Sequence, residues 1–172
     1  MPDTTSASSL PHTHESGTAA NFDQLRIRAD HLFRTAAECC RQHERYAHLS
    51  ERDMEEVELD GAFEQVCLCD RLLGEVAAAY EKAAARAHPD GDDETWWRKA
   101  NALWAASREY ERRHAGCDHA GRRVSSRRSA DKFGELQMEY ELAASALLSL
   151  KQAVDAYRKA RPDAAERPTW RV

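Results

Sequence analysis

The sequence predicts an all-α protein, an up-down-up-down antiparallel four-helix bundle. Three observations support this fold. Apolar residues recur at spacings of three and four in four separate stretches of the 172-residue chain. Glycine and proline are sparse, at 7 and 5 residues, whereas Ala, Arg, Glu and Leu are abundant, as in packed helices. No segment alternates apolar and polar residues with a period of two, as a half-buried strand would.

The N-terminal segment and the first helix differ in composition. Residues 1–20 are rich in Ser, Thr, Pro and His and poor in apolar side chains, so we expect a disordered tail there. A first helix is predicted over about 21–48. Asn21 is a good N-cap, and Gln24 three residues later completes a capping-box pattern.

Turn signals separate the second helix from the third. The second helix is predicted over about 51–87, and its acidic opening suits the partial positive charge of a helix N-terminus. Pro89-Asp90-Gly91 is a strong turn signal, after which a third helix is predicted over about 93–115. Gly116 is expected to end that helix, and 117–128 to form a basic linker.

The fourth helix, predicted over about 129–160, carries the longest apolar seam. The seam residues are Phe133, Leu136, Tyr140, Ala143, Leu147, Leu150, Val154 and Tyr157. This period is typical of a helix that buries one stripe against other helices. Pro162 should stop it, leaving 162–172 as a loose tail. The bundle would then occupy 21–161; a long helical hairpin that completes its core by dimerising is the alternative fold.

Composition and missing motifs narrow the class of function. The net charge of −5 argues against general nucleic-acid binding. Five cysteines without a disulfide-like arrangement suggest reduced thiols, and no signal-peptide pattern or long apolar span is present, so a cytoplasmic location without a membrane span is expected. The sequence has no Gly-rich phosphate loop, Gly-x-Ser-x-Gly, His-Glu-x-x-His or Cys-x-x-Cys. We therefore expect a protein without catalytic residues.

Two seam histidines indicate a candidate metal site. His43 lies about 31 Å along the first helix and His114 about 30 Å along the third, so parallel helices would bring them to the same height. With their neighbours they give six candidate ligands: Cys40, His43, Glu55, Glu111, His114 and Cys117. Thiolates with imidazoles would favour zinc, and carboxylates with imidazoles iron or manganese. The single Glu-x-x-His motif limits the likeness to ferritin-like proteins to architecture, and a polar end-layer of the core is the alternative.

The third helix and the linker after it offer two further candidate surfaces. Trp96, Trp97 and Trp104 widen the apolar stripe of the third helix, which indicates either a protein interface or a broad core contact. The linker concentrates four arginines that would bind an anion or an acidic partner, or simply be solvated: Arg122, Arg123, Arg127 and Arg128.

The function expected from the sequence is that of a non-catalytic helical interaction or scaffold protein. It would bind a protein partner or form a homo-oligomer through the Trp-rich face of the third helix, and would need no cofactor. The alternative is a bundle that binds a metal (Zn, Fe or Mn) or a small cofactor through the His, Cys and Glu side chains at one end of its core.

Overall fold

Four α-helices follow one another in the computed structural model, which describes residues 14–52, 56–87, 94–126 and 130–165. They are α1 (His14–Ser50), α2 (Glu56–Ala84), α3 (Glu94–Ser126) and α4 (Ala130–Ala160), and a short 3₁₀ turn, η2 (Pro162–Ala165), comes after α4. No strand occurs among these residues. The predicted all-α four-helix fold is confirmed.

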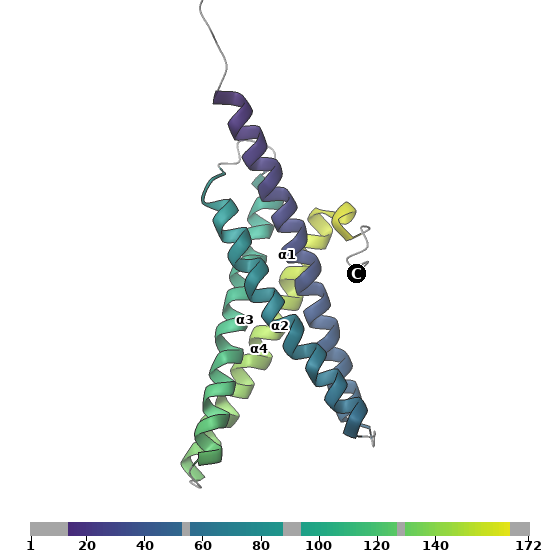
Figure 1. Cartoon of the computed structure of the whole chain (residues 1–172), viewed down its shortest axis with the longest axis vertical. Coiled ribbons are helices and arrows are strands. Elements are labelled where there is room, and N and C mark those ends of the chain that lie inside the picture. Colours follow the sequence, from purple (N-terminus) through teal and green to yellow (C-terminus); the bar gives the residue numbers. More distant parts are fainter. Residues whose placement is uncertain (1–13, 53–55, 88–93, 127–129, 166–172) are drawn as a thin grey trace, which may run out of the picture.

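The helices pair into two antiparallel hairpins, α1 with α2 and α3 with α4 (Figure 1). In the upper half of Figure 1 the hairpins lie against each other, with α1 contacting α4 and α2 contacting α3. In the lower half they diverge. We call the level of divergence, marked by His43, Asp70 and Tyr110, the fork. The diverging parts are the first arm (43–70 of α1 and α2) and the second arm (110–146 of α3 and α4).

The apolar core fills the closed half of the bundle, above the fork. Its largest fully buried aliphatic side chains come from all four helices: Leu25, Leu32, Leu73, Leu103 and Leu150. The end of the α4 seam, Leu150, Val154 and Tyr157, is buried there as predicted. Tyr140, earlier in the same seam, is exposed, because below the fork the arms have diverged and leave that face of α4 open.

Two helices are longer than the sequence predicts. α1 begins at His14, so residues 14–20 are helical where a tail was expected, and no proline interrupts the chain between residues 12 and 50. α3 continues through Gly116 to Ser126, so most of the predicted linker is helix. Gly116 does not end the helix, and a Cβ there would meet only the side-chain carboxylate of Glu139 of α4, 2.8 Å from its Oε2.

A buried polar network ties α1 to the end of α4. Tyr157 donates a hydrogen bond of 2.7 Å to Asp30 Oδ1, and Arg161 donates one of 2.9 Å to Asp30 Oδ2. Burial, and then the bond to Asp30, raise the pKa of Tyr157. Since a buried carboxylate needs partners for both oxygens, this network stabilises the closed half of the bundle.

The helices described here are amphipathic. None of them contains a segment long and apolar enough to cross a lipid bilayer.

Candidate functional site at the fork

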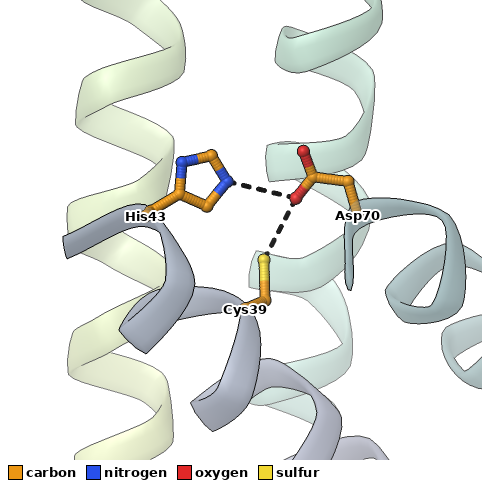
Figure 2. A group of neighbouring side chains, drawn as sticks. All are labelled: Cys39, His43 and Asp70. Carbon is orange, nitrogen blue, oxygen red and sulfur yellow. Dashed lines mark hydrogen bonds and ion pairs between the residues drawn. The ribbon is translucent and has the colours of Figure 1, made fainter. Parts of the chain in front are cut away.

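A polar cluster lies at the fork, and three helices contribute to it. Cys39 and His43 are one turn apart on α1, Asp70 is on α2, and Tyr110 and His114 are one turn apart on α3. A spacing of four residues places both members of a pair on one face of a helix. Both pairs lie next to Asp70 (Figure 2 shows the first pair and Asp70).

One oxygen of Asp70 receives most of the contacts. Cys39 Sγ lies 3.1 Å from Asp70 Oδ1, His43 Nε2 also lies 3.1 Å from it, and the Tyr110 hydroxyl lies 3.0 Å from it. The Tyr110 hydroxyl is in addition 2.5 Å from His43 Nε2. Sulfur, nitrogen and oxygen atoms thus converge on one point, as the dashed lines of Figure 2 show for Cys39, His43 and Asp70.

The second oxygen of Asp70, Oδ2, lacks the hydrogen bonds that Oδ1 receives. Asp70 Oδ2 is buried and has no hydrogen-bond partner among the described residues. The His114 imidazole lies nearby, with Nε2 3.4 Å away and its side chain 31% exposed. The cluster is thus open on the side of His114 and incompletely bonded at its centre.

Asp70 carries a negative charge in this cluster at neutral pH. Burial alone would raise the pKa of Asp70, but hydrogen bonds from His43 and Cys39 and the nearby imidazoles lower it below its usual value. Burial, followed by the charge of Asp70, raises the pKa of the Cys39 thiol and of the Tyr110 hydroxyl. Asp70 is therefore a carboxylate, and both neighbours keep their protons.

The atoms of this cluster are of the types that bind transition metals. The ligand atoms of Cys39, His43 and Asp70 all lie within 4.8 Å of one another, and they form the one such group of three found in the described part of the chain. His43 and Asp70 side chains are 16% and 13% exposed, so an ion from solvent has a route to them. Thiolate, imidazole and carboxylate together suit zinc.

Two of the ligands predicted from the sequence meet here. His43 and His114 lie on either side of Asp70, with ring centroids 6.2 Å apart. Cys40 does not join them: it is buried near Lys151 of α4, and burial, partly offset by Lys151, raises its pKa to about 11. Adjacent helical residues point about 100° apart, so Cys39 and not Cys40 occupies the His43 face.

The other predicted ligands lie elsewhere. Glu111 packs over Gly74 of α2, where a Cβ would be 2.6 Å from its Oε1, and it forms a 2.5 Å ion pair with Arg108. Cys117 is buried on α3 outside the group of three metal-ligating side chains. Glu55 lies outside the described residues.

The sequence reasoning missed Cys39, Asp70 and Tyr110. One signal for Cys39 was available, because it lies four residues before His43 on the same face. Asp70, between the seam residues Cys69 and Leu73, was an acidic residue beside the core stripe of α2. Nothing in the sequence shows that these side chains meet, because the contacts depend on the register of α2 against α1 and on the packing of α3 against both.

The three tryptophans do not form one exposed face. Trp96 is a core residue and packs edge-on against Phe22 of α1, with ring centroids 5.5 Å apart. Trp97 and Trp104 are partly buried against the core. Their indole Nε1 atoms are buried and have no hydrogen-bond partner within the described segments.

The predicted arginine site falls largely outside what the structure describes. Arg122 and Arg123 belong to the last turns of α3 and not to a linker. Arg127 and Arg128 lie outside the described residues. Binding of an anion by these four residues stays a prediction from sequence.

Comparisons of this chain with protein-family models, with curated proteins and with solved structures gave no match.

Proposed function

We propose that the chain is a non-catalytic helical interaction protein that self-associates through the faces that α2 and α4 expose below the fork. One observation carries this proposal. Helix faces that pack between the hairpins at the fork continue onto the arms with exposed aromatic side chains, Phe63 at 50% and Tyr140 at 57%.

Phe63 extends the inter-hairpin face of α2. It lies seven residues, or about two helical turns, before Asp70 and therefore on the same side of the helix. Asp70 bonds to Tyr110 of the other hairpin. Below the fork the hairpins have diverged, and the aromatic contact of Phe63 is with Tyr46 of its own arm, at 5.7 Å between ring centroids.

Tyr140 extends the corresponding face of α4. It lies eleven residues, or about three turns, before Lys151 and so shares its side of the helix. Lys151 forms an ion pair with Glu44 of α1, which joins the two hairpins at the fork. Three turns further down, the first arm has moved away and the Tyr140 ring is left exposed.

Burial of these rings would stabilise a complex. Full burial of an exposed Phe-sized side chain contributes about 1.5–3 kcal/mol, and roughly half of this is still available to each of these half-exposed rings. Aromatic residues are also common hot spots of protein interfaces. Two such rings on the facing sides of two arms therefore form a surface suited to a protein partner.

A second copy of the chain fits this surface by charge. α2 begins with acidic residues, Glu56, Glu58 and Asp60, whereas α3 ends with the basic residues Arg122 and Arg123. In a dimer with twofold symmetry the first arm of one chain can meet the second arm of the other, and the contact occurs twice. Acidic and basic arm ends would then attract each other at both contacts.

The oligomeric state tests the proposal. Multi-angle light scattering and sedimentation velocity should show a dimer for the full chain, and Phe63→Glu or Tyr140→Glu should convert it to a monomer that is still helical. Matched controls exist on the same helices: Leu68→Glu and Met138→Glu alter exposed apolar side chains that point away from those faces. Both controls should remain dimeric.

Two results would contradict the proposal. A wild-type chain that stays monomeric at high concentration has no self-association to explain. Dissociation by Trp104→Glu, with Phe63→Glu and Tyr140→Glu still dimeric, would instead place the interface on the Trp-rich face of α3.

A further inference from the structure

We propose that Cys39, His43 and Asp70 form a binding site for one Zn²⁺ ion at the fork. This inference concerns side chains that the proposed self-association does not use, so either proposal can hold without the other. It rests on the donor atoms, their spacing and the bonding of Asp70.

The spacing of the donor atoms is close to that of a zinc site. Zinc–ligand bonds of about 2.0–2.3 Å in a tetrahedron place neighbouring donor atoms roughly 3.3–3.8 Å apart. Cys39 Sγ and His43 Nε2 are each 3.1 Å from Asp70 Oδ1, and all three ligand atoms lie within 4.8 Å of one another. The two Asp70 distances are within a few tenths of an ångström of this range, and the Sγ–Nε2 separation, at most 4.8 Å, would shorten by up to about 1 Å through side-chain torsions when the ion binds.

The hydrogen bonds of the cluster do not explain why the two oxygens of Asp70 are bonded so unequally. Three groups crowd onto Asp70 Oδ1 while the buried Oδ2 has no hydrogen bond among the described residues. Buried carboxylate oxygens are normally bonded, and each exception requires an explanation. A cation beside Asp70 supplies one, because it would attract both oxygens and take the thiol and imidazole as ligands.

Zinc is the ion that the donor set fits best. A thiolate, an imidazole and a carboxylate are zinc ligands, whereas calcium and magnesium prefer oxygen ligands only. On binding, the S–H bond of Cys39 breaks, its proton passes to solvent, and a sulfur–zinc bond forms without any change in oxidation state. The fourth position would face His114, whose Nε2 is 3.4 Å from Asp70 Oδ2.

The ligands come from one hairpin, which has a structural consequence. Cys39 and His43 belong to α1 and Asp70 to α2, so the ion would join the two helices at the base of the first arm. Because zinc binds the folded chain in preference to the unfolded one, it should raise the melting temperature.

Metal binding by the full chain, purified without an affinity tag and stripped with chelator, tests the site. Addition of zinc sulfate should give one zinc per chain by elemental analysis and a higher melting temperature. Cobalt(II) chloride should produce the near-ultraviolet sulfur-to-cobalt charge-transfer absorption that reports a thiolate ligand. Cys39→Ser should abolish this absorption. His43→Gln and Asp70→Asn should each weaken zinc binding by more than about 100-fold, since loss of an outer-shell partner alone costs 10–100-fold.

A matched control is the neighbouring thiol. Cys40→Ser changes the adjacent buried cysteine, which faces α4, and it should leave the cobalt absorption and the zinc stoichiometry unchanged. The wild-type spectrum decides the matter even where a variant fails to fold. Absence of sulfur-to-cobalt absorption from wild type, or its persistence in Cys39→Ser, would overturn the proposal.

Discussion

Two aspartates show how differently the two halves of this molecule use a carboxylate. Asp30, in the closed half, is buried and has a partner for each oxygen, Tyr157 at 2.7 Å and Arg161 at 2.9 Å. Asp70, at the fork, receives three groups on Oδ1 and no hydrogen bond on Oδ2 from the described residues.

The difference separates a stabilising network from a binding site. Both oxygens of Asp30 are bonded, although Arg161 Nε is buried without a hydrogen-bond partner among the described residues, so the carboxylate has no open position for a further group. An incompletely bonded carboxylate beside solvent, with neighbours that are themselves metal ligands, is a place where a further group would be stabilised. Asp30 therefore belongs to the fold, and Asp70 to a candidate function.

Removal of the two carboxylates should give the largest difference in stability between the closed half and the fork. Asp30→Ala leaves the Arg161 guanidinium buried without its main partner, and loss of one member of a buried ion pair costs about 3–5 kcal/mol of unfolding free energy. Asp70→Ala, in the absence of metal, removes an acceptor from groups at a partly open fork and should cost about 1–2 kcal/mol. Urea denaturation in the presence of chelator measures both.

The control for this comparison is Asp23→Ala, an exposed residue two turns before Asp30 on α1, which should change stability little. Equal losses for Asp30→Ala and Asp70→Ala would show that the fork is as essential to the fold as the closed half, and the contrast would fail.

The sequence predicts the closed half of the molecule better than the fork. Seam residues such as Leu150 and Tyr157 repeat with a helical period and are buried as expected, because burial of one stripe follows from local sequence alone. Helix ends were harder to predict: glycine is common just after a helix end, but α3 continues through Gly116 to Ser126.

The candidate site was predicted only in part. Axial height along parallel helices brought His43 and His114 to the same level, and they do meet. Rotation about the helix axis decides which neighbour joins them, and it selects Cys39 over Cys40. Asp70 could not be assigned, because its contacts depend on the register of α2 against α1, which supplies Cys39 and His43, and on the packing of α3, which supplies Tyr110. No local pattern encodes either.

Removal of a single tyrosine hydroxyl group beside each aspartate should give a smaller difference in stability of the same kind. Tyr157→Phe removes one of the two partners of Asp30, and a buried hydrogen bond to a charged group contributes about 1.5–3 kcal/mol. Tyr110→Phe leaves Asp70 Oδ1 with two further donors, so the loss should stay below about 1 kcal/mol. Denaturation midpoints of the two variants, measured side by side without metal, test this order. A reversed order would mean that Tyr110 and not Tyr157 anchors its carboxylate.

The smallest effect concerns His114, which lies at the edge of the proposed zinc site. Its Nε2 is 3.4 Å from Asp70 Oδ2, and the residue is outside the group of three whose ligand atoms lie within 4.8 Å of one another. His114→Gln should therefore weaken zinc binding about tenfold, as loss of an outer-shell partner does, and less than His43→Gln. Isothermal titration with zinc measures both, with the exposed His48→Gln of α1 as the unchanged control. Equal losses for the two variants would make His114 a direct fourth ligand, and the ion would then bridge α1, α2 and α3 and not one hairpin alone.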